Sequence, residues 1–397
     1  MVLIDLALYA TLAALALAAL VPCAYLFTQT LMSGRLRTPL PVSRRLRFDL
    51  VVPAYNEAQA IAATVANLLQ IDWPRDQYRI LVVADNCTDA TAAMAAAAGA
   101  TVLERQDLSQ RGKGYALRFA FQRSHEDSRA DAVVVIDADS LVSSNLLEAF
   151  AARIEQGAHA IQAHHGVLNP GRAWRTRLLA IAIAANHVVR SRARERAQLS
   201  SGIRGNGWCV THALLQKVEY NAFSLAEDLE FGIDLGLNGY RVFYAGEAYA
   251  SQEMVADAKT ARKQRQRWEH GRFHLIRTRT LPLLRTALKH RSAVCLDLAL
   301  DLIVLPLSYV ALNVGALLLI SVLAARWNPA FHGWVWLSLL CTATLVLYVA
   351  RGWQLSGTGA RGLLDLAGAP FFVVWKVILM LERRRSTEWI RTDRKAS

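Results

Sequence analysis

Three long stretches of the chain carry no charged residue. They cover residues 6–27, 302–325 and 333–350, and each is long enough to cross a bilayer as a helix. The second and third are joined by a short link, residues 326–332, and therefore predict a transmembrane hairpin. No Lys or Arg precedes Arg35, whereas a cleaved signal peptide begins with basic residues, so the first stretch favours an uncleaved anchor over a signal peptide.

Basic residues flank the same end of all three stretches. Five arginines follow the first, residues 289–291 precede the second, and Arg351 follows the third. Because basic loops remain in the cytoplasm, these ends are expected to be cytoplasmic. A further apolar run begins at Leu366 but contains Lys376, and we interpret it as an interfacial or re-entrant helix before a basic cytoplasmic tail.

Between residues 48 and 257, short apolar runs alternate with helical stretches. This pattern predicts an α/β domain with a mostly parallel sheet covered by helices on both faces. Ligands of such sheets bind at the carboxyl ends of the strands. Three of the runs end in polar residues, which predicts a nucleotide-type crevice formed by Tyr55, Asn56, Glu57, Asp85, Asn86, Asp137 and Asp139.

Two of these carboxylates suggest a metal site. Asp137 and Asp139 follow a buried strand directly, and carboxylate oxygens are the ligands that Mg²⁺ or Mn²⁺ prefers when it bridges a diphosphate. A short D-x-D sequence is common by chance, and its alternative is a solvated turn. Its position at a strand end beside Asp85 favours metal–diphosphate binding.

Composition narrows the class of protein. The 397 residues are 54% hydrophobic, and the net charge of +13 lies largely beside the apolar stretches, where attraction to anionic lipid explains it. No aromatic-interleaved basic face stands out, so nucleic acid is not an expected partner. The five cysteines form no C-x-x-C pair, which indicates neither a disulfide framework nor a zinc site.

The chain resembles the membrane-integrated family-2 glycosyltransferases, the branch that includes cellulose synthase, hyaluronan synthase and ceramide glucosyltransferase-like enzymes. The resemblance covers residues 48–272 and rests on four motifs in order, VVPAYNE with VVADN, VVVIDADS, AEDLEFG and QRQRW. It implies a GT-A fold joined to transmembrane helices, a nucleotide sugar as donor and Mg²⁺ or Mn²⁺ as cofactor. The motifs place the donor, metal, acceptor and diphosphate residues at Tyr55, Glu57, Asp85, Lys113, Asp137, Asp139, Glu227, Asp228, Gln264, Arg267 and Trp268.

The resemblance also implies individual roles. Tyr55 and Glu57 are expected to line the nucleoside pocket, and Lys113 to approach the nucleotide. Asp85 is expected to accept a hydrogen bond from the imide of the base, which points to uridine. The residues alone support Lys113 less, since its RGKG sequence lacks the spacing of a phosphate-binding loop and is also compatible with an exposed loop.

An acidic pair, Glu227 and Asp228, begins an amphipathic helical pattern. By resemblance Asp228 is the general base that deprotonates the acceptor; its alternative is a helix N-terminal charge favoured by the macrodipole. Gln264, Arg267 and Trp268 share one face of a later helix, and offer a charge for the leaving diphosphate and an aromatic surface for a sugar. A basic helix lying on lipid headgroups explains the arginine but not the shared face.

Three further features remain open. The segment 203–210 has two glycines and is compatible with the floor of an acceptor site or with a tight turn. His164 and His165 either face the donor or lie in a turn. His270 and His274 have the spacing of a metal site but no evident third ligand.

These observations predict an inverting transferase at the cytoplasmic face of a cell membrane, the inner membrane in a Gram-negative bacterium. The expected acceptor is a growing polysaccharide, a lipid-linked glycan or a membrane lipid. A homo-oligomer or a complex with partner membrane proteins is compatible with the sequence. The alternative class of protein is a non-catalytic sensor of a nucleotide or a glycan. The expected division is an anchor at 1–30, a basic linker at 31–47, a catalytic domain at 48–257, interfacial helices at 258–292, a membrane hairpin at 293–351 and an interfacial helix with a basic tail at 352–397.

Overall fold

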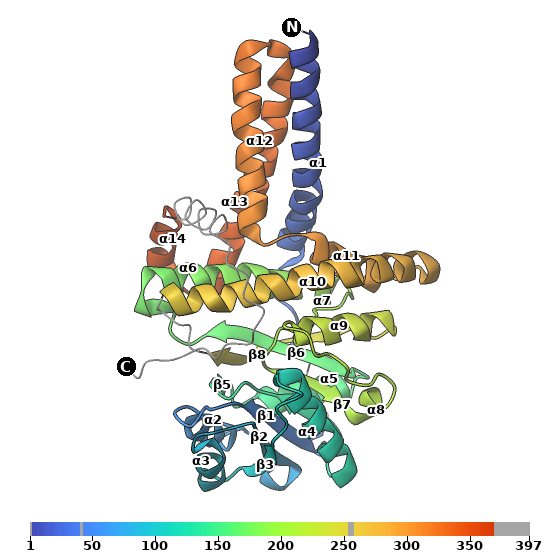
Figure 1. Cartoon of the computed structure of the whole chain (residues 1–397), viewed down its shortest axis with the longest axis vertical. Coiled ribbons are helices and arrows are strands. Elements are labelled where there is room, and N and C mark those ends of the chain that lie inside the picture. Colours follow the sequence, from blue (N-terminus) through green and yellow to red (C-terminus); the bar gives the residue numbers. More distant parts are fainter. Residues whose placement is uncertain (1, 40–42, 253–257, 369–397) are drawn as a thin grey trace.

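The protein is described from a computed structural model. The description covers residues 2–39, 43–252 and 258–368, with the side chains of all of these except Val2 and residues 258–268. Three tiers follow one another along the long axis: an upright bundle of helices, a layer of helices lying across its base, and a sheet domain (Figure 1). The tail from residue 369, on which the prediction of an interfacial or re-entrant helix largely falls, lies outside the described residues.

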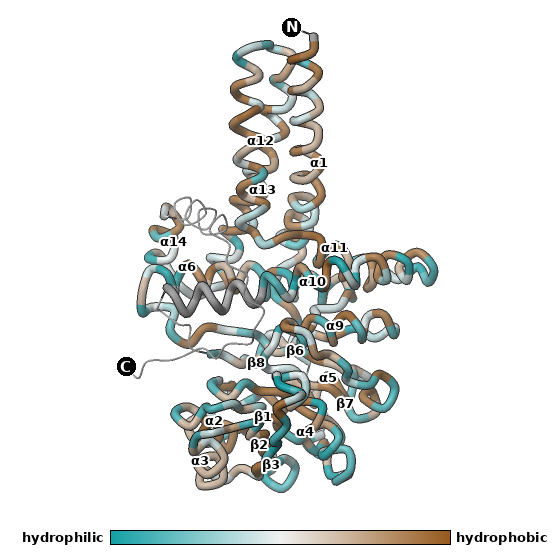
Figure 2. Tube along the Cα trace, in the orientation of Figure 1, coloured by the Kyte–Doolittle hydropathy of each residue, from teal (hydrophilic) through white to brown (hydrophobic). Residues whose placement is uncertain are grey.

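The upright bundle consists of the three predicted apolar stretches. They form α1 (Val2–Met32), α12 (Leu307–Trp327) and α13 (His332–Ser356), and Figure 2 shows them as the most hydrophobic part of the molecule. By length and composition each is able to cross a membrane. Leu12 and Leu317 are buried between the helices, whereas Leu17 is 69% exposed on the outside, as expected of a surface that faces lipid.

The second apolar stretch begins later than expected. Its helix starts at Leu307 rather than at residue 302, because Pro306 cannot continue the preceding helix, α11 (Ala293–Ile303). The link between α12 and α13 contains the short helix η4 (Pro329–Phe331). The hairpin is otherwise as the sequence predicted.

The sheet domain has eight strands in the order β3-β2-β1-β4-β7-β6-β8-β5. Four of the seven strand pairings are parallel, and antiparallel β7 divides the parallel half from the rest, so the α/β prediction is confirmed with a mixed sheet. The strands are β1 (Phe48–Ala54), β2 (Tyr78–Asp85), β3 (Thr101–Arg105), β4 (Ala132–Val135), β5 (Ser140–Val142), β6 (Ala160–Val167), β7 (Trp208–Thr211) and β8 (Phe243–Gln252).

Helices cover both faces of the sheet. Successive residues of β1 point to opposite faces, so Leu50 packs in one buried cluster and Val51 in the other. One face is covered by α2 (Ile61–Leu68), α3 (Thr91–Ala97) and α5 (Leu146–Ile154), and the other by α4 (Lys113–Asp127), α8 (His212–Leu215) and α9 (Glu227–Leu237). Strands buried on both faces explain the continuous apolar runs in the sequence.

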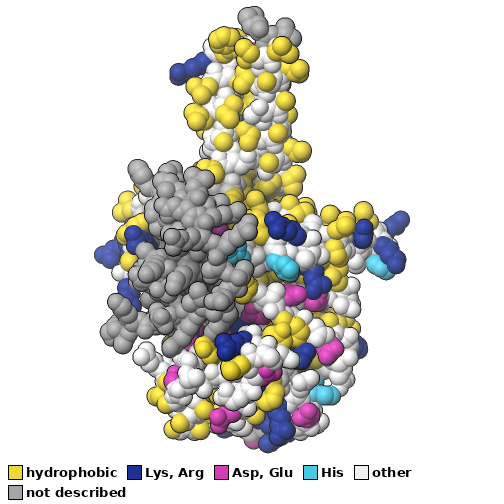
Figure 3. Space-filling model, viewed as in Figure 1, with side chains coloured by type: hydrophobic (Ala, Val, Ile, Leu, Met, Phe, Trp, Pro, Cys, Tyr) yellow, Lys and Arg dark blue, Asp and Glu magenta, His cyan; other side chains and the backbone are white. Residues whose placement is uncertain are grey.

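The middle tier, which we call the collar, joins the bundle to the sheet. Residues 174–196 form α6, a π-helical turn and α7, and α13 approaches this turn so closely that a Cβ on Gly352 would lie 2.6 Å from the Cβ of Ala185. The collar elements are α6 (Trp174–Ile183), η3 (Ala184–Val189), α7 (Arg190–Arg196), α10 (Ala258–His290), α11 and α14 (Gly359–Leu366). In the space-filling view of Figure 3, hydrophobic side chains predominate on the bundle, with basic atoms near its far end, and charged side chains are frequent from the collar downward.

Candidate active site

Polar residues gather where β1, β2 and β4 end. The parallel register pairs Ala54 with Ala84 and Val51 with Val135, so the residues that follow the three strands emerge at one edge of the sheet. Tyr55 and Glu57 follow β1, and the Glu57 amide donates to Thr91 Oγ1 at 2.8 Å, which fixes the loop after this strand. The structure therefore brings these strand-end residues to one edge of the sheet, as the sequence predicted.

Asp85, the last residue of β2, is 6% exposed and ion-paired. Arg105 of β3 donates to Asp85 Oδ1 at 2.6 Å, and Asn86 Nδ2 donates to the same oxygen at 3.1 Å. Burial raises the pKa of Asp85, and the bond from Arg105 opposes this rise. Sequence reasoning missed Arg105, although it is a polar residue at the end of β3, like those of the other three strands.

Lys113, at the N-terminus of α4, lies between two acidic residues and a backbone carbonyl. Its Nζ donates to Asp137 Oδ1 and to the Gly205 carbonyl, both at 2.6 Å, and lies 3.8 Å from Glu227 Oε1. These carboxylates raise the pKa of Lys113 although its burial opposes the shift, so the side chain is an ammonium at neutral pH. Lys113 is thus part of the site and not of an exposed loop.

Asp137 and Asp139 lie directly after β4, on either side of Ala138. Ser140 Oγ donates to Asp139 Oδ1 at 3.4 Å. Within the described residues, no group of three or more His, Cys, Asp or Glu side chains is placed to hold a metal ion. Two carboxylates fit a hard divalent cation whose remaining ligands are diphosphate oxygens and water.

The acidic pair begins α9, as the sequence predicted. Burial raises the pKa of Glu227 to about 7, and nearby Lys113 opposes the shift. Burial also raises the pKa of Asp228, again opposed by Lys113. A carboxylate whose pKa is moved toward neutrality is a stronger general base than one in water, because it holds a proton more tightly while remaining substantially ionised.

The loop before β7 approaches Asp228 with its backbone. Gly205 has φ +85°, and a Cβ at this position would lie 3.3 Å from Asp228 Oδ2. Asn206, which is fully buried, accepts the Asp137 amide proton at 3.0 Å and donates to Ser140 Oγ at 2.8 Å. The loop therefore holds both acidic sequences in place. Sequence analysis singled out its two glycines but missed Asn206.

Helix α10 packs on the start of α9. A Cβ on Gly271 would lie 2.8 Å from the Cβ of Ala226, the residue before the acidic pair, and Arg279 binds Asp234 at 3.1 Å. Gln264, Arg267 and Trp268 belong to α10 one to two turns before Gly271, but their side chains lie outside the described residues. The backbone thus brings this part of α10 to the acidic pair.

A family model described as "Glycosyltransferase like family 2" matches residues 46–271, more than half of the chain. The chain belongs to glycosyltransferase family 2. The match contains the eight strands and the acidic positions described above, and α10 as far as Gly271.

Relatives of this family-2 glycosyltransferase include enzymes of lipid and polysaccharide synthesis. The beta-monoglucosyldiacylglycerol synthase of Synechocystis is 27% identical, over a match that covers 56% of this chain and 47% of the synthase. The cellulose synthase 1 catalytic subunit of Komagataeibacter xylinus is 24% identical, over 65% of this chain and 35% of the subunit. The probable glycosyltransferase YdaM of Bacillus subtilis is 22% identical, over 58% of this chain and 56% of YdaM. The chain thus spans about half the length of these relatives, or less.

The fold is shared with a mannosyltransferase of Pyrobaculum calidifontis, PcManGT, whose structure is a complex with GDP-Man and Mn²⁺. The two chains superpose with a TM-score of 0.54 at 20% identity, over 85% of this chain and 98% of the other. This coverage extends beyond the sheet domain, and it confirms the GT-A fold class of the glycosyltransferase.

The histidines of the glycosyltransferase differ from the sequence expectation. His164 and His165 lie in β6 and not in a turn, and the ring of His165 is 5.1 Å from that of His187 in η3. Burial lowers the pKa of both β6 histidines to about 4, so they are neutral at pH 7. His270 and His274 are exposed on α10, where no described group of three ligands includes them.

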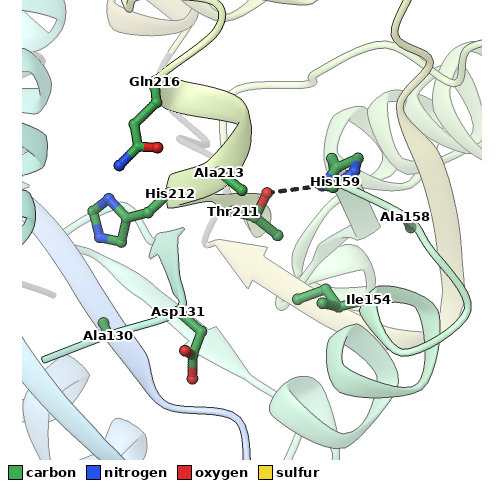
Figure 4. A pocket seen from close by; sticks show the side chains of 9 residues that line it. All are labelled: Ala130, Asp131, Ile154, Ala158, His159, Thr211, His212, Ala213 and Gln216. Carbon is green, nitrogen blue, oxygen red and sulfur yellow. Dashed lines mark hydrogen bonds between the residues drawn. The ribbon is translucent and has the colours of Figure 1, made fainter. Parts of the chain in front are cut away.

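A separate pocket of about 400 Å³ lies at the opposite edge of the sheet. Asp131, His159, Thr211 and His212 line it, and His159 Nδ1 lies 3.1 Å from Thr211 Oγ1 (Figure 4). These residues precede β4 and β6 or follow β7, whereas the acidic residues follow β4. The pocket is therefore not the site that the carboxylates form.

Proposed function

We propose that the protein is an inverting glycosyltransferase that moves a sugar from a nucleotide sugar to an acceptor at the membrane surface. The observation that carries this proposal is the position of Asp228, a partly buried carboxylate with a raised pKa beside Gly205, Lys113 and the Asp137 strand end. This position suits a general base that takes the proton from an acceptor hydroxyl. Direct attack of that hydroxyl on the anomeric carbon breaks the bond to the diphosphate and inverts the configuration.

The strand ends would bind the donor. Tyr55, Glu57 and Asp85 are proposed to hold the nucleoside, with Asp85 toward the base, as in a UDP-sugar. Asp137 and Asp139 would hold Mg²⁺ or Mn²⁺, which neutralises charge on the departing diphosphate. The Mn²⁺ in the structure of PcManGT supports this use of a metal in the fold.

The described part of α10 supports a role for its preceding turns. Gln264 is seven residues before Gly271, so the two positions share a helical face, and Gly271 packs against Ala226. We propose that Arg267 stabilises the leaving diphosphate and that Gln264 and Trp268 contact the sugar or acceptor.

The acceptor is proposed to be a growing polysaccharide or lipid-linked glycan, with a membrane lipid as the alternative. Relatives named for both kinds of product are known, the cellulose synthase subunit and the glucosyldiacylglycerol synthase. The three apolar helices pack against one another with a buried core that includes Leu12, Leu317 and Tyr348. One such bundle leaves no room for a polysaccharide channel, which favours lipid-borne acceptors for a single chain.

Replacing the proposed base tests the function. Asp228→Asn preserves the size of the side chain but cannot accept a proton at neutral pH. A general base contributes about 10²- to 10⁴-fold in rate, so sugar transfer by the purified protein should fall by at least that range. Nucleotide binding, measured by calorimetry, should be unchanged, because the donor is held by other residues.

Asp234→Asn is the matched control, since it makes the same chemical change on the same helix. Arg279 retains Glu230 at 3.0 Å in this variant, and transfer should stay near the wild-type rate. Transfer by Asp228→Asn at the wild-type rate would refute the assignment of the base, and loss of nucleotide binding would place Asp228 in the donor site instead.

A further inference from the structure

Four arginines and two aspartates form a buried group in the collar. Arg190 and Arg194 come from α7, Asp297 and Asp301 from α11, Arg204 from the loop next to Gly205, and Arg272 from α10; we call these six residues the arginine cluster. The Arg194 side chain is fully buried, and those of Arg204 and Asp301 are 7% and 3% exposed. The cluster has two more positive than negative charges.

The aspartates satisfy mainly the arginines of α7. Asp301 Oδ1 lies 2.6 Å from Arg190 and 2.9 Å from Arg194, and Asp297 Oδ2 lies 2.9 Å from Arg194. Arg204 is only within 3.8 Å of Asp301, beyond hydrogen-bond distance.

Several guanidinium nitrogens have no acceptor among the described residues. These are Nε and Nη2 of Arg204, Nε of Arg272 and Nη1 of Arg194. Nη2 of Arg272 is used elsewhere, since it donates to the Asp301 and Val304 carbonyls at the end of α11. Arg204 therefore retains two nitrogens without an acceptor among the described residues, and its ion pair with Asp301 is longer than a hydrogen bond.

A buried cation without a counter-charge is costly, and a guanidinium does not lose its proton readily. Burial lowers the pKa of Arg204, as do the neighbouring Arg194 and Arg190. Burial lowers the pKa of Arg272 to about 10, so Arg272 remains charged at neutral pH. The planar fork of arginine matches the oxygens of a phosphate group. A phosphate group would therefore supply acceptors for the nitrogens that lack a partner among the described residues.

The location of the cluster indicates where the phosphate comes from. Tyr25 of α1 donates to Asp297 at 2.9 Å, and Tyr348 of α13 accepts from Arg190 Nε at 3.1 Å, so the cluster lies at the base of the apolar bundle, at the level of lipid headgroups. Arg204 also adjoins Gly205, whose backbone contacts Asp228. The cluster thus connects the lipid surface with the proposed base.

We propose that Arg204 and Arg272 bind a phosphate group carried by a membrane lipid, and that this lipid phosphate positions the acceptor beside Asp228. The inference rests on the proposed function in taking the lipid to be the acceptor. The binding site itself requires no turnover, so it can be tested separately.

The test measures lipid binding to the full-length protein in detergent, by native mass spectrometry. Phosphatidic acid is compared with diacylglycerol, which has the same tails without the phosphate, and with inorganic phosphate. Phosphatidic acid should bind, and the other two should bind at least about tenfold more weakly. Arg204→Gln should weaken phosphatidic acid binding about tenfold or more, which is the effect of losing charge-assisted hydrogen bonds.

Arg285→Gln is the matched control, because it removes the same charge from an exposed position on α10. Its affinity for phosphatidic acid should stay within about twofold of wild type. Arg204→Lys, which preserves the charge but not the fork, should fall between wild type and Arg204→Gln. Nucleotide binding should be unchanged in all three variants and serves as the check that each is folded.

Three outcomes would overturn the inference. If diacylglycerol binds as tightly as phosphatidic acid, the phosphate group is not recognised. If inorganic phosphate binds as tightly as phosphatidic acid, the lipid part is not recognised. Loss of nucleotide affinity in folded Arg204→Gln would assign the arginine to the donor. If no sugar is transferred by the wild-type protein while phosphatidic acid binding still depends on Arg204, the proposed function fails and the lipid site stands.

Discussion

Glu227 and Asp228 share one lysine. Lys113 lies 3.8 Å from Glu227 but only 2.6 Å from Asp137, so Asp137 takes most of its charge. The partial burial of the acidic pair, which Lys113 offsets only in part, is the physical origin of the raised pKa values at the start of α9. A metal ion and a diphosphate would alter this balance when the donor binds.

The raised pKa of Glu227 predicts a pH-dependent stability. The carboxyl ionises near pH 4.5 in the unfolded chain and near pH 7 in the folded protein. Its stabilising contribution to the free energy of unfolding is therefore fully present below pH 4.5 and is lost as the pH rises through 7. Glu227→Gln does not titrate, and we expect its advantage over wild type to grow by about 2–3 kcal/mol across this interval.

Thermal unfolding in metal-free detergent buffer measures this effect. The Tm of Glu227→Gln minus that of wild type should increase between pH 4.5 and 8. Glu219→Gln, which changes an exposed glutamate, should run parallel to wild type. A constant difference for Glu227→Gln would show that the carboxyl is already ionised in the folded protein at low pH.

The carboxylates after β4 predict dependence on a divalent metal. Chelation should abolish transfer, and excess Mg²⁺ or Mn²⁺ should restore it, because Asp137 and Asp139 are ligands of the type that these ions prefer. Asp139→Asn should raise the metal concentration required for half-maximal activity. Full activity in excess chelator would remove the metal from the mechanism.

At the scale of elements, three segments fix the position of Asp228. The start of α9 carries it, the loop before β7 touches it through Gly205, and α10 covers it where Gly271 packs on Ala226. The proposed base thus lies beside two close-packed glycines, Gly205 and Gly271, where an added Cβ would meet a neighbour at 3.3 Å and 2.8 Å.

Gly205→Ala should therefore reduce transfer more than it reduces stability. The new methyl group would lie 3.3 Å from Asp228 Oδ2, in addition to the strain of φ +85°. Gly239→Ala is the matched control, since Gly239 has φ +84° with no atom within 4 Å of the added Cβ. Both variants should lose about 1 kcal/mol of stability, and only Gly205→Ala should lose at least tenfold in kcat. Equal activities would mean that the loop does not position the base.

Sequence predicted the elements whose signal is local. The apolar runs predicted the three apolar helices and the buried strands, and the polar ends of β1, β2 and β4 predicted which residues gather at one edge of the sheet. These predictions were possible because hydropathy and side-chain alternation are properties of a few neighbouring residues. Arg204 and Asn206 were missed because their roles depend on antiparallel β7 joining β4. This pairing joins Val135 to Trp208, 73 residues later, and no local pattern encodes it. Arg105 required knowing that β3 lies beside β2.

At the scale of the whole molecule, the bundle and the sheet domain lie at opposite ends, with the collar between them (Figure 1). Residues 43–47 lead from the side of the collar into β1, whereas the α12–α13 link lies at the far end of the bundle. A membrane around the bundle would place these two positions on opposite sides.

Cysteine labelling of intact cells tests this orientation. With a membrane-impermeant maleimide applied from outside, Ala330→Cys in the link should be labelled, and Arg45→Cys and Ser397→Cys should not. Four of the five natural cysteines are buried, and the fifth, Cys87, lies in the sheet domain, so background labelling should be low. Labelling of Arg45→Cys or Ser397→Cys in intact cells would contradict the proposed cytoplasmic position of the catalytic domain.

The arginine cluster has a consequence for how the chain can be divided. Arg190 and Arg194 lie within the stretch that matches the family model, whereas Asp297 and Asp301 lie beyond its end at residue 271. A fragment cut at the boundary of the match would retain buried arginines and lose both aspartates, a loss that typically costs about 3–5 kcal/mol for each broken pair. The stretch that matches the family model is therefore smaller than the set of elements that these ion pairs join, and we expect a fragment excised at its boundary to be less stable than the full chain.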